Sequence, residues 1–241
     1  FYGFDAYDPR RGWALKPNVQ GARDPDGTVV TSNSRGLRGA KEFPLDKPAG
    51  TPRLLLLGDS FTFGAEVADE ETFAAGLGKR LPGVDVLNLG VHGYGHDQML
   101  LYLRDEGVKY NPDVVLVGFV GDDMLRNLLE FRDFAKPRFT LEGDRLIPHG
   151  IPVPSPDSVL RAEPLEPKLL DLAQVLRAQA AWKSGEKMRE AHELTAALLD
   201  AIAQSGEDAG ATPVFAYFPT AREVDFGGGI AQADEQFLMD W

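Results

Sequence analysis

The sequence of 241 residues lacks cysteine, carries little basic charge and contains no long hydrophobic run. The absence of cysteine excludes disulfide bonds, cysteine-ligated zinc and thiol catalysis. Lys and Arg total 25 against 37 Asp and Glu, a formal net charge of −12, which argues against binding to nucleic acid or to an anionic membrane surface. The longest apolar runs, such as residues 114–120, have the length of strands, so the sequence predicts no membrane span.

The rest of the composition is typical of one medium-sized globular domain. Hydrophobic residues make up 43% of the chain, which is enough for a full core. The sequence begins with Phe1 rather than methionine and has no recognisable signal peptide, which indicates a processed or trimmed protein. Composition leaves the oligomeric state open.

Residues 1–50 differ from the rest of the chain. They are rich in Gly, Pro, Asn, Asp and Arg and show little periodicity, apart from a short strand expected at residues 28–31. We interpret them as an extended arm packed on the domain formed by residues 51–241. A second interpretation is that the loop carrying Arg35 and Arg38 contacts an anionic or sugar substrate.

From residue 51 onward, predicted strands alternate with predicted helices. We expect strands at residues 53–57, 84–89, 113–119 and 213–218, and helices at residues 69–81, 97–106, 123–131, 169–182 and 186–204. This alternation favours a parallel sheet with right-handed crossovers, and hence an α/β fold: a three-layer α/β/α sandwich with a flavodoxin-like sheet. An insertion at about residues 132–168 contains a predicted hairpin around residues 139–147, followed by a proline-rich loop or extended segment.

The strongest candidate for chemistry is Ser60, in the run Gly58-Asp59-Ser60-Phe61-Thr62-Phe63-Gly64. The run directly follows four leucines that predict a buried strand, so the serine is expected at the carboxyl edge of the sheet, where open α/β folds bind ligands. A serine in this position is a candidate nucleophile, although it needs a base to accept its proton. We expect Asp59 to anchor the turn. The alternative is a serine that only caps a helix or contributes to a phosphate-binding turn.

This run resembles the first signature block of the SGNH/GDSL hydrolases, in the form found in bacterial serine esterases and acyltransferases. The resemblance continues through Asn88-Leu89-Gly90 and the region around Asp122, and it covers most of the chain from about residue 50. It implies the SGNH hydrolase fold, with Ser60 as the nucleophile. It also implies that the N–H groups of Ser60 and Gly90 hold the oxyanion, because glycine permits close approach of the backbone to a substrate. The alternative for Gly90 is a role in turn geometry alone.

Asp122 departs from the family pattern. It occupies the place where the family has an asparagine that donates to the oxyanion. An ionised carboxylate cannot donate, so Asp122 would serve only if an enclosed site raised its pKa and kept it protonated. Loss of one such donor typically lowers the rate by about 10²–10³. We expect Asp123 and Asn127 to fix the loop and the start of the following helix.

A second departure concerns the base. Family members carry an Asp-x-x-His motif near the carboxyl end, and residues 1–241 contain none, which we interpret as truncation. Two of the four histidines, His92 and His96, lie on the Gly90 loop and are candidates for a substitute base or for loop and substrate contacts. His149 and His192 are expected to have no catalytic role. The spacing of the histidines supports no metal site.

The leading hypothesis is therefore a serine hydrolase that cleaves or transfers an O-acyl ester on a carbohydrate through a Ser60 acyl-enzyme. We expect a small-molecule or glycan ester as substrate, and no cofactor or metal. The resemblance also implies an extracytoplasmic origin. A second hypothesis, motivated by Asp122 and the missing motif, is a catalytically impaired carbohydrate-binding or scaffold module. A third, a flavodoxin-like nucleotide or phosphate binder, is disfavoured because no Gly-x-Gly-x-x-Gly or lysine-bearing phosphate loop is present.

Overall fold

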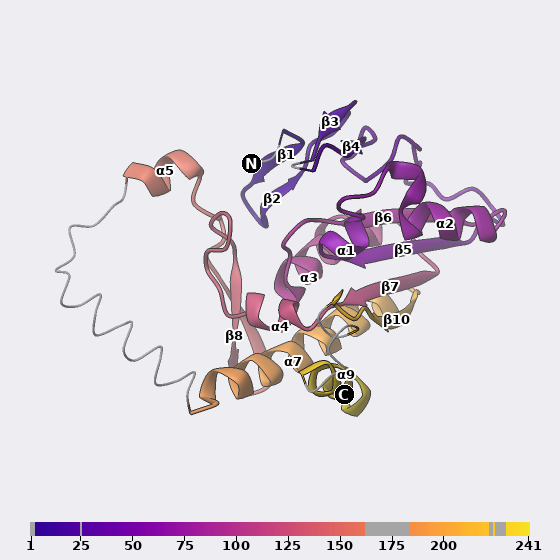
Figure 1. Cartoon of the computed structure of the whole chain (residues 1–241). Helices are drawn as coiled ribbons and strands as arrows, with labels where there is room; N and C mark the ends of the chain where they lie inside the picture. The colour runs from indigo at the N-terminus through magenta and orange to yellow at the C-terminus, as the bar shows by residue number, and fades with distance from the viewer. Residues whose placement is uncertain (1–2, 25, 162–183, 222–223, 225–229) are drawn as a thin grey trace.

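The computed structural model describes residues 3–24, 26–161, 184–221, 224 and 230–241. Its centre is a four-stranded parallel sheet with the strand order β10-β7-β5-β6 (Figure 1). The strands are β5 (Arg53–Gly58), β6 (Asp85–Gly90), β7 (Val114–Phe119) and β10 (Thr212–Tyr217). All four were predicted from the sequence to within a residue at each end, and the α/β sandwich fold is confirmed.

The leucine run forms β5, an inner strand with a neighbour on each side. Leu56 pairs with Asn88 of β6 and with Leu116 of β7, and the side chains of Leu55, Leu56 and Leu57 are fully buried. A strand that is covered on both faces is apolar at successive positions, which explains why the sequence shows a run rather than an alternation.

Helices cover both faces of the sheet. On one face, helices α3 (His96–Asp105) and α7 (Glu186–Asp208) pack with Val115 and Val117 in the main core. On the other face, Leu116 lies near α2 (Phe73–Arg80), while the short α1 (Ser60–Phe63) packs against β5 and β6. Successive residues of β7 therefore point to opposite layers, as the pleat requires.

The helix expected at residues 69–81 is divided. A 3₁₀ turn, η1 (Asp69–Glu71), precedes α2, and Thr72 lies between the two. The Thr72 hydroxyl accepts a hydrogen bond from the Ala75 N–H at 3.1 Å. A threonine in extended conformation that caps α2 in this way begins a new helix, which explains the break.

The insertion is partly as expected. Strands β8 (Arg138–Glu142) and β9 (Arg145–His149) form the predicted hairpin. Helix α4 (Asp122–Arg126) is shorter than the expected 123–131, because the chain then turns into a bridge between Phe131 and Ala135. The proline-rich segment is not entirely irregular, since α5 (Pro156–Arg161) forms with proline at its first position, where the missing N–H costs nothing. The helix expected at residues 169–182 lies outside the described residues.

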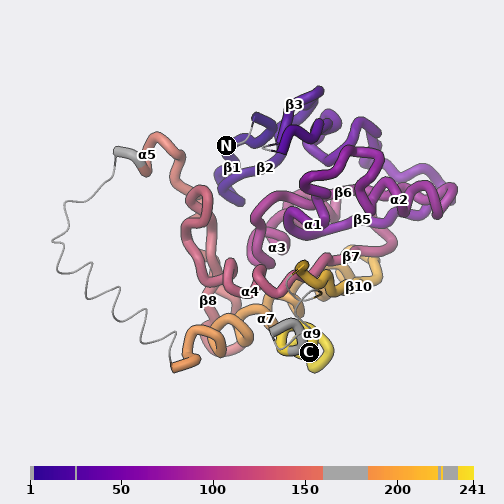
Figure 2. Tube along the Cα trace, viewed as in Figure 1, coloured from indigo at the N-terminus to yellow at the C-terminus, as the bar shows by residue number. Residues whose placement is uncertain are grey.

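The arm contains two small antiparallel pairs of strands. Strand β1 (Asp5–Asp8) pairs with β2 (Gly12–Leu15), and β3 (Ala22–Arg23) pairs with β4 (Val29–Val30). The strand expected at residues 28–31 is β4. Trp13 and Leu37 belong to the main core, and the Trp13 indole N–H donates to the carbonyl of His92 at 2.8 Å. The arm therefore packs directly on the loop after β6 (Figure 2). The domain boundary at residue 50 stays a prediction.

The C-terminal part contains a helix that the sequence analysis missed, α9 (Ile230–Asp240). Its Phe237 ring stacks on Phe119 with centroids 6.1 Å apart, and the Trp241 indole donates to Asp200 at 3.0 Å. The glycine-rich loop expected at residues 227–229 lies outside the described residues. No helix in the described part of the chain is long and apolar enough to cross a membrane.

Candidate functional site

Ser60 is the first residue of α1, two positions after the end of β5. Gly58 is required there, because a Cβ at this position would lie 2.0 Å from the Thr62 hydroxyl. The Asp59 side chain caps the helix and accepts a hydrogen bond from the Phe61 N–H at 2.9 Å. The sequence thus places Ser60 at the carboxyl edge of an inner strand, as expected from the motif.

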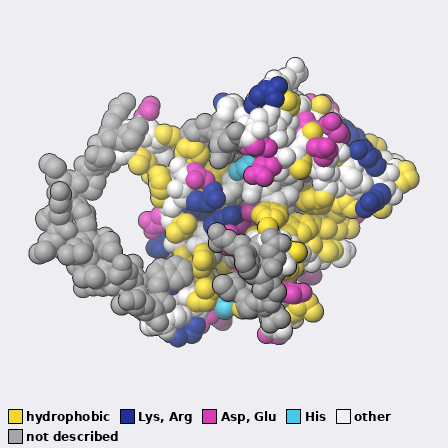
Figure 3. Space-filling model, viewed as in Figure 1, with side chains coloured by type: hydrophobic (Ala, Val, Ile, Leu, Met, Phe, Trp, Pro, Cys, Tyr) yellow, Lys and Arg dark blue, Asp and Glu magenta, His cyan; other side chains and the backbone are white. Residues whose placement is uncertain are grey.

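A cavity of about 320 Å³ opens at Ser60 and is called here the Ser60 cavity. Four segments form its wall: the β3–β4 turn of the arm, the start of α1 with the residues that follow the helix, the loop after β6, and the loop 131–135. Its lining residues are Asp24, Asp26, Ser60, Ala65, Glu66, His92, Gly93, Arg132 and Asp133. In Figure 3, acidic side chains gather beside a histidine between the arm and α1.

A buried charge network lies behind Ser60. Asp59 is fully buried, and its Oδ2 accepts a hydrogen bond from Arg126 at 2.8 Å and lies 3.5 Å from the Ser60 hydroxyl. Arg126 also pairs with the fully buried Asp123. Burial, together with the nearby charge of Asp59, raises the pKa of Asp123 well above its usual value. With two partners fixed in this way, Asp59 serves to anchor the turn, which agrees with its expected role.

Gly90 is placed differently from its expected role as an oxyanion donor. Its N–H donates to Asn88 Oδ1 at 2.9 Å, and a Cβ at this position would lie 2.2 Å from the Phe63 nitrogen. Asn88 in turn donates to the carbonyl of Thr62 at 2.9 Å. Gly90 is therefore needed for the close approach of β6 to α1, and it does not line the Ser60 cavity. A donor role for it would require the bond to Asn88 to break.

Gly93, three residues later, does line the Ser60 cavity. It has a φ of +71°, in the left-handed region that favours glycine, and a Cβ would lie 2.3 Å from Arg132 Nη1. Within the described residues, no hydrogen bond partner is found for the Gly93 N–H or for the Ser60 N–H. These two N–H groups are therefore candidate backbone donors at the cavity wall.

Asp122 is exposed at the start of α4 and is not part of the cavity wall. The enclosed surroundings that the sequence analysis considered for Asp122 are found at the next residue, Asp123, which is fully buried. Asn127 is buried, accepts a hydrogen bond from the His96 N–H at 2.8 Å and donates to Thr195 at 2.8 Å. Asp123 and Asn127 thus hold the loop, as the sequence analysis expected.

Of the four histidines, His92 lines the Ser60 cavity. Its ring centroid lies 4.1 Å from that of Phe63, and its Nε2 is 3.7 Å from Asp24 Oδ2. Burial and the positive charge of Arg38 lower the pKa of His92 to about 4, so the ring is neutral at pH 7. A neutral imidazole is able to accept a proton.

The other histidines lie away from the cavity. His96 is fully buried at the start of α3, beside Asn127, and burial lowers its pKa to about 3. His149 contacts the Thr140 hydroxyl at 2.7 Å within the hairpin. His192, on α7, lies against Phe237 of α9. Packing explains all three.

The Arg35 and Arg38 loop does not reach the Ser60 cavity. Arg38 is buried, where it donates to Asp69 at 2.6 Å and to the carbonyl of Val67 at 3.0 Å, and its guanidinium lies over the Phe63 ring. Its donors fasten the arm to the segment after α1, and the interpretation of the Arg35 and Arg38 loop as a substrate contact stays a prediction.

Sequence reasoning missed much of the cavity wall. Asp24 and Asp26 belong to an Asp-Pro-Asp-Gly turn, which signals a turn but not its location. Glu66 has a φ of +64° without any sequence signal for it. Arg132 lies in the insertion, which had no assigned role. Among the residues that were missed, only Gly93, within the glycine-rich loop after the second strand, carried a recognisable signal.

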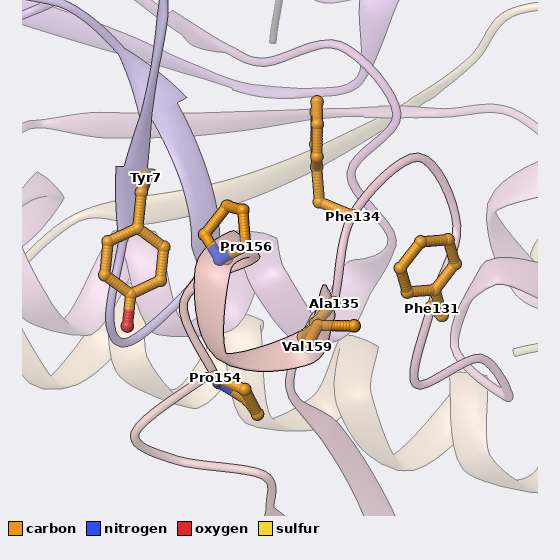
Figure 4. Close-up of a pocket in the computed structure, with 8 residues that line it drawn as sticks. Tyr7, Phe131, Phe134, Ala135, Pro154, Pro156 and Val159 are labelled. Carbon is orange, nitrogen blue, oxygen red and sulfur yellow. The ribbon is translucent and has the colours of Figure 1, made fainter. Parts of the chain in front are cut away.

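A second, smaller cavity of about 180 Å³ lies between the arm and the insertion (Figure 4). Tyr7 and Phe131 stand on its two sides, with Pro154, Pro156 and Val159 between them. It is apolar and contains no group suited to catalysis. Among the described residues, no group of three or more His, Cys, Asp or Glu side chains is arranged to hold a metal ion.

No family model matches this chain, and no curated protein matches it. Among solved structures, the chain is similar to the one described as the crystal structure of TesA. The two share 17% sequence identity over 78% of this chain and 71% of that chain, with a TM-score of 0.43.

Proposed function

We propose that this protein is a serine hydrolase of the SGNH/GDSL type, which cleaves or transfers an O-acyl ester through an acyl-enzyme on Ser60. The observation that carries the proposal is the position of Ser60. It lies at the first turn of α1, at the carboxyl edge of the parallel sheet, and opens into a polar cavity. Open α/β sheets bind their ligands at this edge.

In the proposed reaction, Ser60 Oγ attacks the acyl carbonyl carbon and gives its proton to a base. The carbonyl oxygen becomes an oxyanion, which the N–H groups of Ser60 and Gly93 stabilise. The tetrahedral intermediate then expels the alcohol, which takes the proton and leaves the acyl group on Ser60. Water releases the acyl group as an acid, whereas a second alcohol receives it by transfer.

His92 is the candidate base within the cavity. It is neutral at pH 7, and its Nε2 lies 3.7 Å from Asp24 Oδ2, which is beyond hydrogen-bond distance. Its low pKa makes it a weak base, so the proposed activity of residues 1–241 is modest. The alternative is a base supplied from outside these residues, and the experiment below separates the two.

The test is reaction of the purified chain with a fluorophosphonate probe, followed by mass spectrometry of the adduct. Ser60 Oγ attacks phosphorus and fluoride leaves, so labelling reports an activated serine. We expect labelling confined to Ser60 and abolished in Ser60→Ala. Loss of labelling in His92→Gln, with labelling retained in the control His149→Gln, would identify His92 as the base.

Absence of labelling in a folded wild-type chain would contradict an active hydrolase in residues 1–241. It would favour the second candidate, a catalytically impaired carbohydrate-binding module. That candidate is supported by the exposed Asp122 in the asparagine position and by the use of the Gly90 N–H in a bond to Asn88. It predicts glycan binding without turnover.

A further inference from the structure

We propose that the β3–β4 turn of the arm binds the alcohol part of the substrate, through carboxylates that accept hydrogen bonds from hydroxyl or ammonium groups. The inference rests on the proposed hydrolase function, since it assigns a role to one wall of the Ser60 cavity. This wall, called here the acidic wall, consists of Asp24, Asp26 and Glu66.

Asp24 gives the strongest support. Its side chain lines the Ser60 cavity although the residue is only 8% exposed. The carboxylate accepts a hydrogen bond from the backbone N–H of Glu66, whereas its Oδ2 has no hydrogen bond partner within the described part of the chain. Buried polar atoms nearly always have a partner, so an unpartnered oxygen in a cavity wall indicates the place of a ligand donor.

Glu66 is held in place from both sides. Its φ of +64° is unusual for a residue with a side chain. Arg38 donates to the carbonyl of Gly64 at 3.3 Å and to that of Val67 at 3.0 Å, which fixes the chain before and after Glu66. Glu66 is thereby held in the cavity wall, with its N–H toward the Asp24 carboxylate.

Asp26 adds charge at the rim. It accepts hydrogen bonds from the hydroxyl of Thr28 at 2.7 Å and from the Thr28 N–H at 3.1 Å, and these bonds lower its pKa. Asp26 is therefore ionised at neutral pH. The fourth carboxylate of the cavity, Asp133, is paired with Arg132, so the excess negative charge lies on the acidic wall.

This chemistry defines a class of substrate. Asp26 is ionised, burial raises the pKa of Asp24, and carboxylate oxygens accept hydrogen bonds. The acidic wall therefore suits an alcohol rich in donors, such as a neutral sugar or a protonated amino sugar. It repels an anionic sugar such as a uronate. The arm thus selects against acidic glycan esters, although it lies outside the α/β sandwich.

The experiment measures binding without turnover. We would titrate the Ser60→Ala protein with methyl glucoside, glucosamine and glucuronate at neutral pH and follow the titration by NMR. We expect the affinity to be highest for glucosamine, lower for the neutral glucoside and lowest for glucuronate. Equal or tighter binding of glucuronate overturns the proposal, and so does the absence of binding by all three sugars.

A second variant locates the site. Asp24→Asn in the Ser60→Ala background should weaken glucosamine binding about tenfold, which corresponds to about 1.4 kcal/mol. The matched control is Asp144→Asn, which makes the same charge change at the exposed hairpin turn. Equal effects of the two variants would refute a site at Asp24.

Two checks keep the outcomes separate. Thermal melting of each variant shows whether it folds. If Asp24→Asn does not fold, Asp26→Asn replaces it, and we expect that variant to weaken glucosamine binding as well. Fluorophosphonate labelling of Ser60 in the wild-type chain needs no sugar. Labelling without sugar binding would overturn the acidic wall alone, whereas sugar binding without labelling would overturn the hydrolase.

Discussion

The buried ion pair between Lys136 and Asp97 should be essential for stability. Both side chains are fully buried, and Lys136 also donates to the carbonyls of Leu129 at 3.0 Å and of Pro137 at 2.9 Å. Replacing Lys136 by methionine keeps the apolar stem but leaves Asp97 without its counter-ion. Removal of one partner from a buried pair typically costs about 3–5 kcal/mol, and we expect a loss of that size in Lys136→Met.

The pH dependence gives a sharper criterion. Burial already raises the pKa of Asp97 in spite of Lys136, and removal of the lysine raises it further. An acid whose folded-state pKa exceeds its unfolded value, about 3.9, costs stability as the pH rises from that value toward the folded pKa. The stability lost in Lys136→Met should therefore be smaller at pH 5 than at pH 8.

The assay is urea unfolding of wild type and variant at both pH values, with two-state analysis. The matched control is Lys109→Met, because Lys109 pairs with Glu106 at the surface and such pairs contribute only about 0–1 kcal/mol. A loss in Lys136→Met below about 1 kcal/mol, or one that is the same at pH 5 and pH 8, would refute the reasoning.

Three further outcomes are expected. Gly90→Ala should lower the unfolding free energy by at least about 1–3 kcal/mol, because the new Cβ meets the Phe63 backbone. The control Gly76→Ala, where a Cβ meets no atom within 4 Å, should not lower it, and thermal denaturation of both variants tests this. Asp123→Asn should gain stability relative to wild type as the pH rises above about 4, since the raised pKa of Asp123 makes its ionisation unfavourable; a flat difference in urea unfolding would contradict this. Trp13→Ala should cost about 3–5 kcal/mol, measured by the same unfolding assay, because it removes a core side chain and its bond to His92; a loss under about 1 kcal/mol would mean that the arm packs loosely.

The sheet could be predicted because its signals are local. Strand β5 is a run of four leucines, and α7 repeats apolar residues at helical spacing. The boundaries that were wrong depend on contacts that the sequence does not display. Helix α4 ends early because the chain turns into the bridge from Phe131 to Ala135.

The candidate site was predictable only in part, for a related reason. Ser60 lies in a motif, and a motif is visible in the sequence. The Ser60 cavity is assembled from segments far apart in the chain, so Asp24 and Arg132 carry no local signal of their placement. Gly90 ends β6 and Gly93 lies in the loop that follows, and the hydrogen bond that the Gly90 N–H donates to Asn88 Oδ1 is not visible in the sequence.

The contacts between the arm and the insertion have a consequence for biosynthesis. The Tyr7 hydroxyl donates to the carbonyl of Val153, 146 positions later, and the Val153 N–H donates to the carbonyl of Pro9. At translation rates of about 5–20 residues per second, about 7–30 s pass between the synthesis of Tyr7 and that of its partner Val153. During that interval the nascent chain cannot form the bonds that join the arm to the insertion.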